Sequence, residues 1–390
     1  MTTTVDTAVT SRAAALDASG WGIRFRLVQV RNLCFWVFAV GVLGGIYEMF
    51  RYYGPGISSY GTGLRLGVVA FGIYTVPWLI LLAYHNRYTR LPGNLLLAAF
   101  AWGAAAATFW IALPANGALL SLYGKAFGQA WVSDWGAGLT ASINEEIAKG
   151  LALILMIGLA PRLVRSPFDG LIIGAYTGLG FQISEDILYA YNSTAGNFGA
   201  DQAGSVWSIV LARSTSGLFG HVLFSAVFCS GIMWLLGRGE RSHRLRGVLL
   251  MLGAMAAHGL WDNMSALGWQ LAGNFGVLLL WIIVLPGADL LLLWLAFRLA
   301  VPQEQAWLRA ILAPETETGL LTEAEVTAAA GGWRTRRRYR RAQSGHHGRQ
   351  RAKHLLAAAN DLAEEIAQAG GHNTQRVDHA RSEITRLRTT

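Results

Sequence analysis

A series of long apolar runs constrains this chain more than any other feature. A helix that rises 1.5 Å per residue needs about 20 apolar residues to cross a bilayer. Runs of about this length lie near 32–50, 63–84, 94–114, 136–160, 168–191, 206–237, 247–268 and 273–299. Only 14% of residues are charged and 53% are hydrophobic, which leaves too little polar surface for a water-soluble core. We expect an all-α polytopic membrane protein with about eight transmembrane helices.

The basic residues predict the orientation of these helices. They gather in the lead and in alternate connections: Arg24, Arg26 and Arg31; Arg87 and Arg90; Arg162 and Arg165; Arg238, Arg241, Arg244 and Arg246. Excess Lys and Arg marks the cytoplasmic side, so both termini are predicted to be cytoplasmic. Arg51 and Arg65 fit this pattern less well, because they fall on the outer side. The Ala/Gly/Arg/Trp-rich composition points to a bacterial cell membrane.

Composition divides the chain into three parts. Residues 1–31 are a cytoplasmic lead. Its Thr/Ala-rich part, Met1 to Ser19, lacks the apolar region of a signal peptide and is expected to be disordered. Residues 32–300 form the transmembrane domain. Residues 301–390 form a basic cytoplasmic tail with short amphipathic helices, one of them near 351–368, where Leu355, Leu362 and Ile366 recur at helical spacing.

The tail contains an unusual basic run, with six arginines between Arg334 and Arg341. A solvated, disordered segment is one interpretation. Attraction to anionic lipids of the cytoplasmic leaflet is the second. Nucleic-acid binding is disfavoured, because the run has no aromatic platform beyond Trp333 and Tyr339 and no binding fold.

Three charged residues interrupt the fourth apolar run, and each is costly at the centre of a membrane helix. At about 100° per residue, Lys149 projects between Glu145 and Glu146, one turn further along the helix. One base can partly neutralise either acid, but two acids leave a surplus negative charge. We therefore expect partners from other helices.

The fifth run supplies one such partner. Gly170, Gly174 and Gly178 form a ridge of small residues that allows another helix to approach closely. Phe181 and Glu185 project onto the same arc, so Glu185 is expected to face protein. The adjacent Asp186 points about 100° away and is predicted to be a supporting or water-facing acid.

Two later runs carry histidines. His221 is predicted at the middle of the sixth helix, and His258 lies one turn before Asp262 on the seventh, where the acid can fix the imidazole tautomer. Counted along helices of opposite direction, Glu145, Glu185 and the His258–Asp262 pair share a level about 9–15 Å below the outer surface. Arg213 is expected to lie at the interface, Pro286 should kink the last helix, and Asp289 has no predicted role.

The four patterns Glu-Glu-x-x-Lys, Phe-x-x-x-Glu, a helix His and His-x-x-x-Asp resemble the PrsW family of intramembrane proteases, which is related to type II CAAX prenyl proteases. The resemblance spans about 140–265, within a motif core at 137–268. Lys149 and Glu185 favour the PrsW branch, because the CAAX branch usually has Arg and His there. The resemblance implies hydrolysis of a membrane-anchored protein, an anti-sigma factor or similar signalling protein being the family's known kind of substrate.

The predicted catalytic residues are Glu145, Glu146, Lys149, Glu185, His221, His258 and Asp262. In the preferred scheme, which is metal-free and resembles that proposed for the relatives, Glu145 is the base for a water near the outer half of the bilayer. The alternative is a zinc site with ligands among Glu146, Glu185, His221 and His258.

Two other functions use the same polar groove. A proton-coupled transporter would show structural repeats and helices broken at the site. A non-catalytic scaffold would bind partners without cleaving them. The sequence specifies neither the substrate nor the oligomeric state.

Overall fold

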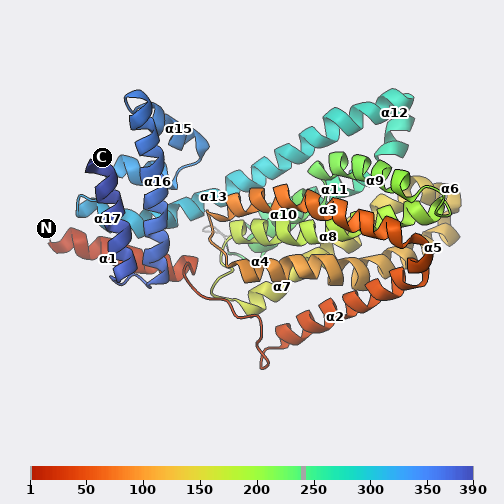
Figure 1. Cartoon of the computed structure of the whole chain (residues 1–390), viewed down its shortest axis with the longest axis horizontal. Coiled ribbons are helices and arrows are strands. Elements are labelled where there is room, and N and C mark those ends of the chain that lie inside the picture. Colours follow the sequence, from red (N-terminus) through yellow and green to blue (C-terminus); the bar gives the residue numbers. More distant parts are fainter. Residues whose placement is uncertain (1, 239–242, 390) are drawn as a thin grey trace.

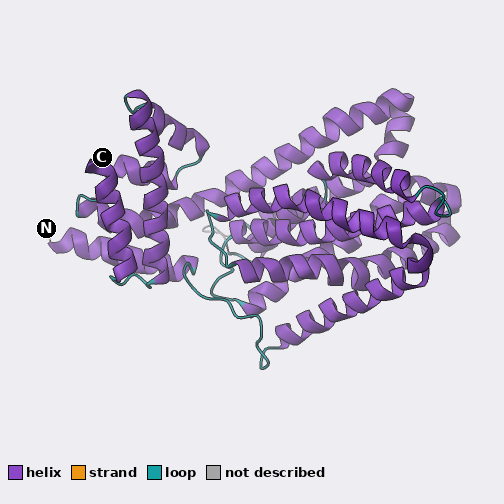
Figure 2. Ribbon diagram, in the orientation of Figure 1, coloured by secondary structure: helices purple, strands orange, loops and turns teal. Residues whose placement is uncertain are grey.

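The structure is a computed structural model that describes residues 2–238 and 243–389. Helix accounts for 86% of the chain, and these residues contain no strand (Figure 2). The expected all-α fold is confirmed. Arg241, which contributes to one predicted cytoplasmic connection, lies outside the described residues.

The elements follow one another along the chain as α1 (Thr2–Ser19), α2 (Leu33–Tyr53), η1 (Gly54–Gly56), α3 (Ile57–Asn86), α4 (Gly93–Ala101), η2 (Trp102–Ala112), α5 (Leu113–Phe127), α6 (Gln129–Trp131), η3 (Val132–Gly136), α7 (Ala137–Leu159), α8 (Pro167–Gly196), α9 (Gln202–Ser216), η4 (Gly217–Phe219), α10 (His221–Leu235), α11 (Arg244–Asp262), α12 (Met264–Leu279), η5 (Leu280–Val284), α13 (Leu285–Glu317), α14 (Glu323–Ala330), α15 (Trp333–Arg341), α16 (Gly345–Gln368) and α17 (Gln375–Thr389). Two bodies result, joined by α13. The larger holds α2–α12, and the smaller holds α1 and α14–α17, with both chain ends (Figure 1).

Three helical stretches of the described chain are long and apolar enough to cross a membrane. They are Leu33–Asn86, Gly93–Phe127 and Met264–Glu317, and the apolar helix His221–Leu235 is shorter. These stretches fit an integral membrane protein. The count of about eight spans and the cytoplasmic location of both termini stay predictions.

The glycine ridge of α8 packs against α10. A Cβ built on Gly174 would lie 2.2 Å from the Ser225 carbonyl oxygen, and one on Gly178 would lie 2.3 Å from the His221 carbonyl oxygen. Only glycine allows two helix backbones to come this close. The predicted close approach is therefore confirmed, and it places the start of α10 directly beside the middle of α8.

The expected single helix at 206–237 is wrong. The chain forms α9 and α10 with a short 3-10 segment between them, and Gly220 has φ −103° and ψ −142°, outside the helical region. His221 is therefore the first residue of α10 rather than a mid-helix residue. Gly217 and Gly220 explain the break, because glycine stabilises a helix interior poorly and tolerates such backbone angles.

The last apolar run also differs from expectation. The backbone leaves helical geometry at Ala272 and Gly273, and a π-helical segment, Leu280–Val284, ends two residues before Pro286. The α13 helix then continues past Pro302 to Glu317 and enters the smaller body. The predicted boundary near residue 301 therefore lies inside a continuous helix.

The N-terminal lead and the tail are folded together, contrary to the expected disorder of residues 2–19. Helix α1 packs on α13, where Arg12 donates to the Ile311 carbonyl and pairs with Glu315 at 2.8 Å. Arg381 of α17 also pairs with Glu315, at 2.8 Å. The buried apolar side chains beneath them come from α1, α13, α14, α16 and α17. The contacts of Arg12 link residues about 300 positions apart, which local composition does not reveal.

The predicted helix near 351–368 is confirmed as the later part of α16, which begins earlier, at Gly345. The basic run is also helical, as α15, so its interpretation as a disordered segment is wrong.

Candidate active site

The acid pair of α7 is buried and held by neighbours on several helices. Lys149 Nζ lies 2.6 Å from Glu146 Oε1 and 3.8 Å from Glu145 Oε2, so the single base does lie between the two acids. Its ammonium also lies 4.5 Å from the centroid of the Phe181 ring. All three charged side chains are at most 4% exposed. Burial of this depth requires full pairing, because an unpaired charge in such surroundings is strongly destabilising.

Glu146 is saturated by its partners. Its Oε1 contacts Lys149 Nζ and lies 3.0 Å from His258 Nδ1, and its Oε2 accepts a hydrogen bond from Ser225 Oγ at 3.2 Å. Glu146 therefore fixes the orientation of His258 and leaves the other imidazole nitrogen, Nε2, directed elsewhere.

Glu145 is only half satisfied. Its Oε1 accepts a hydrogen bond of 2.9 Å from Asn116 Nδ2, and Asn116 in turn accepts one from Asn144. Its Oε2 is buried and has no hydrogen-bond partner among the described residues. The same holds for His258 Nε2, which lies 3.6 Å from Glu145 Oε2. Two buried polar atoms without partners, so close together, indicate a position for a water or an ion.

His221 links α10 to the charged residues of α7 and α8. Its Nδ1 lies 3.0 Å from Lys149 Nζ, and its Nε2 lies 2.9 Å from Glu185 Oε2. The two imidazole rings, of His221 and His258, have centroids 5.0 Å apart. The break before α10 makes this possible, since it places His221 at a helix start beside Gly178.

Arg213 has partners that the sequence did not predict, while its expected position at the membrane interface stays a prediction. It pairs with Glu185, and its Nε lies 2.5 Å from Asp186 Oδ1, with a quarter of the side chain exposed. It is therefore part of the site's charge network. Asp186 is fully buried in this pair, which fits a supporting acid and excludes a water-facing one.

Every predicted site residue lies in this cluster. Asp262 Oδ2 is 3.5 Å from His258 Nε2, as the one-turn spacing predicts, and its side chain is a quarter exposed. Asn116, Ser225 and Arg213 complete the cluster. Ser225 lies one turn after His221 on the same side of α10, whereas no local pattern identifies Asn116. Asp289, in contrast, is buried on α13 and does not line the cavity.

The cluster opens into a cavity of about 300 Å³. Its walls come from α5, α7, α8, α9, α10 and α11, together with Gly217 of the break. The polar side chains that line it include Asn116, Glu145, Gln182, Glu185, Arg213, His221, His258 and Asp262. A concave space with convergent acids and imidazoles is the usual form of an enzyme site.

The sequence of the larger body identifies its relatives. A family model for the PrsW family of intramembrane metalloproteases matches residues 91–287, half of the chain. The chain belongs to the PrsW family. A search of curated proteins and a search of solved structures each gave no match. Membership confirms the predicted resemblance. The chain is an intramembrane protease and an integral membrane protein.

The family description as metalloproteases raises the question of whether these residues fit a metal. Glu145, His221 and His258 offer donor atoms that all lie within 4.8 Å of one another. Tetrahedral zinc ligands with bonds of about 2.0–2.1 Å lie about 3.4 Å apart. The separations of Glu145 Oε2 from His258 Nε2 and from His221 Nδ1 are 3.6 and 3.8 Å.

The donor set therefore fits zinc in type and spacing, and Glu146 supports His258 as a carboxylate supports many metal-bound histidines. Lys149 would have to leave His221 Nδ1 for all three donors to bind. The set differs from the predicted candidates, because Glu146 and Glu185 are already engaged by Lys149, Ser225 and Arg213.

Proposed function

We propose that this PrsW-family protein hydrolyses a peptide bond of a membrane-anchored protein with a water held between Glu145 and His258. The observation that carries the proposal is the pair of buried, unpartnered atoms, Glu145 Oε2 and His258 Nε2, 3.6 Å apart at the cavity. A carboxylate at hydrogen-bond reach of a water can take its proton as the water attacks a carbonyl carbon.

Glu145 is the proton acceptor in this scheme. Asn116 holds its Oε1, which leaves Oε2 free to face the water. The water then attacks the scissile carbonyl, and the oxyanion that develops needs donors already in place. His258 Nε2 fills this role when the imidazole is doubly protonated, because Glu146 accepts the proton of the opposite nitrogen and sets the ring's orientation.

The leaving amine requires a proton. Glu185 and His221 form a hydrogen-bonded pair of 2.9 Å beside the cavity, and Arg213 orients Glu185 from the other side. We assign the proton relay to this pair. Lys149 is assigned to stabilise the ionised forms of Glu145 and Glu146. Asp262, partly exposed next to His258, faces the substrate side.

If zinc is bound, Glu145, His221 and His258 would hold it, and it would supply Lewis-acid polarisation of the carbonyl and acidification of the water. Glu146 would then orient His258 as before. Dialysis against a chelator tests this. Activity that is lost and restored by one equivalent of zinc assigns the metal-assisted form, and activity that is unchanged in protein free of metal by elemental analysis assigns the metal-free form.

The decisive test of the activity uses detergent-purified protein and a panel of single-span membrane proteins, including membrane-bound anti-sigma factors. Wild type is compared with Glu145→Ala and with Glu48→Ala, a matched control whose acid pairs with surface Arg51. We expect cleavage by wild type and by the control and none by Glu145→Ala. Cleavage that survives Glu145→Ala in folded protein would sink the assignment of the base.

One observation favours a different function. The break between α9 and α10 at the site is a feature expected of a proton-coupled transporter. Family membership favours hydrolysis instead. The same break also serves a protease, because it brings His221 into contact with Lys149. A folded protein that cleaves no member of the panel, yet acidifies proteoliposomes in a Glu145-dependent way, would establish the transporter.

A further inference from the structure

Helix α15 presents two different faces, and only one of them is used inside the protein. Its inner face carries Arg336, which donates to the carbonyls of Gly331 and Ala329 at the end of α14, and Tyr339, which contacts Glu325. A cation at a helix C-terminus is well placed, because it meets unpaired carbonyls there. The inner face therefore seats α15 on the rest of the smaller body.

The outer face carries four of the other five arginines of the run. At about 100° per residue, Arg334, Arg337, Arg338 and Arg341 fall within one arc of about 100°. We call these four residues the basic face. Among the described residues none of them forms an ion pair, although nearby Glu325 is paired with Arg388 at 2.5 Å. Like charges one turn apart destabilise a helix unless an anion neutralises them, so this face lacks its counter-charge.

An exposed tryptophan borders the basic face. Trp333 is 57% exposed, and the Arg337 guanidinium lies 4.7 Å from the centroid of its ring. Tryptophan concentrates at the level of lipid headgroups, where its ring is apolar and its N–H is hydrated. Arginines beside an exposed tryptophan match an anionic bilayer surface better than they match water.

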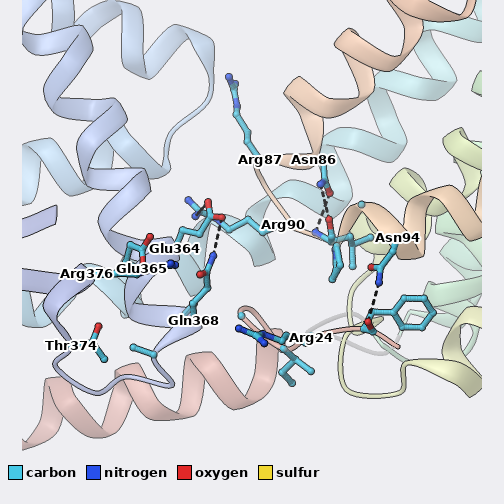
Figure 3. A pocket seen from close by; sticks show the side chains of 18 of the residues that line it. Arg24, Asn86, Arg87, Arg90, Asn94, Glu364, Glu365, Gln368, Thr374 and Arg376 are labelled. Atoms are coloured by element: carbon cyan, nitrogen blue, oxygen red, sulfur yellow. Dashed lines mark hydrogen bonds and ion pairs between the residues drawn. The ribbon is translucent and has the colours of Figure 1, made fainter. Parts of the chain in front are cut away.

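The position of α15 supports the same partner. The α3 helix ends at Asn86, at the end of a candidate membrane span. Just beyond it, Arg90 pairs with Glu364 at 2.9 Å and donates to the Asn360 carbonyl of α16. Figure 3 shows Arg90 reaching across a cavity of about 920 Å³ to Glu364, while Arg87 extends in another direction.

The Asn360 side chain contacts the Ala329 carbonyl, which is also the acceptor for Arg336 of α15. The pKa of the Arg336 guanidinium is lowered by burial and then by the positive charge of Arg87. Because Arg87 directly follows α3, the end of α3 lies near α15. α15 therefore lies at the level where a spanning α3 leaves the bilayer.

We propose that the basic face and Trp333 bind the phosphate headgroups of anionic phospholipids in the leaflet on the tail's side. Each arginine near such a surface adds attraction, and the fixed helix holds four of them in one orientation. The smaller body is thereby held against the membrane through α15 as well as through α13.

The test is native mass spectrometry of the delipidated full chain, titrated with phosphatidylglycerol or with phosphatidylcholine. The variant R334Q/R338Q/R341Q removes three charges from the basic face. The variant R309Q/K353Q/R376Q removes three exposed charges elsewhere in the same body. We expect phosphatidylglycerol binding to weaken at least about tenfold in the first variant and less than twofold in the second.

Equal binding by wild type and the first variant, or an equal loss in both variants, would overturn the proposal. So would equally tight binding of phosphatidylcholine. Inorganic phosphate at millimolar concentration is the remaining arm, and displacement of the lipid by it would overturn the assignment to a headgroup. In nanodiscs, we expect amides 333–341 to exchange more slowly when phosphatidylglycerol is present.

Discussion

The close packing of α8 on α10 makes Gly178→Ala a sharp test of how the site is positioned. A Cβ at residue 178 would lie 2.3 Å from the His221 carbonyl oxygen, about 1 Å short of the 3.4 Å at which ordinary contact begins. This oxygen belongs to the backbone, so the start of α10 must move. His221 begins that helix and contacts both Lys149 and Glu185.

The expected cost follows from this displacement. Overpacking of this kind destabilises by about 1–3 kcal/mol. A shift of about 1 Å in a catalytic group lowers activity by about 100-fold. We therefore expect Gly178→Ala to unfold at lower temperature in detergent and to lose about 100-fold in kcat/KM on a cleaved single-span substrate.

Gly72→Ala is the matched control. Residue 72 is also a helical glycine, in α3, but a Cβ there would meet nothing within 4 Å. Alanine stabilises a helix by about 0.5–1 kcal/mol relative to glycine, so this variant should be as stable as wild type or more so, with normal activity. Normal cleavage by Gly178→Ala, or equal losses in both variants, would refute the reasoning.

Two further predictions concern buried charges. Lys149→Met should destabilise the protein by about 3–5 kcal/mol, because it leaves Glu146 buried without its cation, and unchanged thermal unfolding would contradict this. Burial acts to raise the pKa of Glu315, but the bonds from Arg381 and Arg12 outweigh it and lower the pKa below its ordinary value. The stability this gives is complete above about pH 4.3 and is lost as the pH falls through the lower folded pKa. Amide exchange in α1 and α17 should therefore accelerate in acid, and exchange that is the same at pH 6 and pH 3 after correction for the intrinsic rate would refute it.

Local spacing predicts much of the site because helix geometry is regular. The positions of Lys149 between two acids and of Asp262 one turn after His258 follow directly from 3.6 residues per turn. The α8 ridge is equally readable, since three glycines four residues apart face one way. These features depend on one helix at a time.

Features that depend on two distant segments are not predictable in this way. Arg213 looks interfacial by its place in the chain, and only the approach of α9 to α8 reveals its pairing with Glu185 and Asp186. The lead looks disordered by composition, yet Arg12 meets Glu315 about 300 residues later. The break before His221 was hidden because apolar residues continue across Gly217 and Gly220.

The central claim is that Glu145 and His258 act on the same water, and a double-mutant cycle of cleavage rates measures this most directly. The variants Glu145→Gln and His258→Gln and their combination are compared on one substrate, with folding checked for each. We predict that each single change lowers kcat by about 10²–10⁴-fold and that the double variant is no slower than the slower single variant. Losses that multiply in the double variant, or full activity of Glu145→Gln, would contradict the claim.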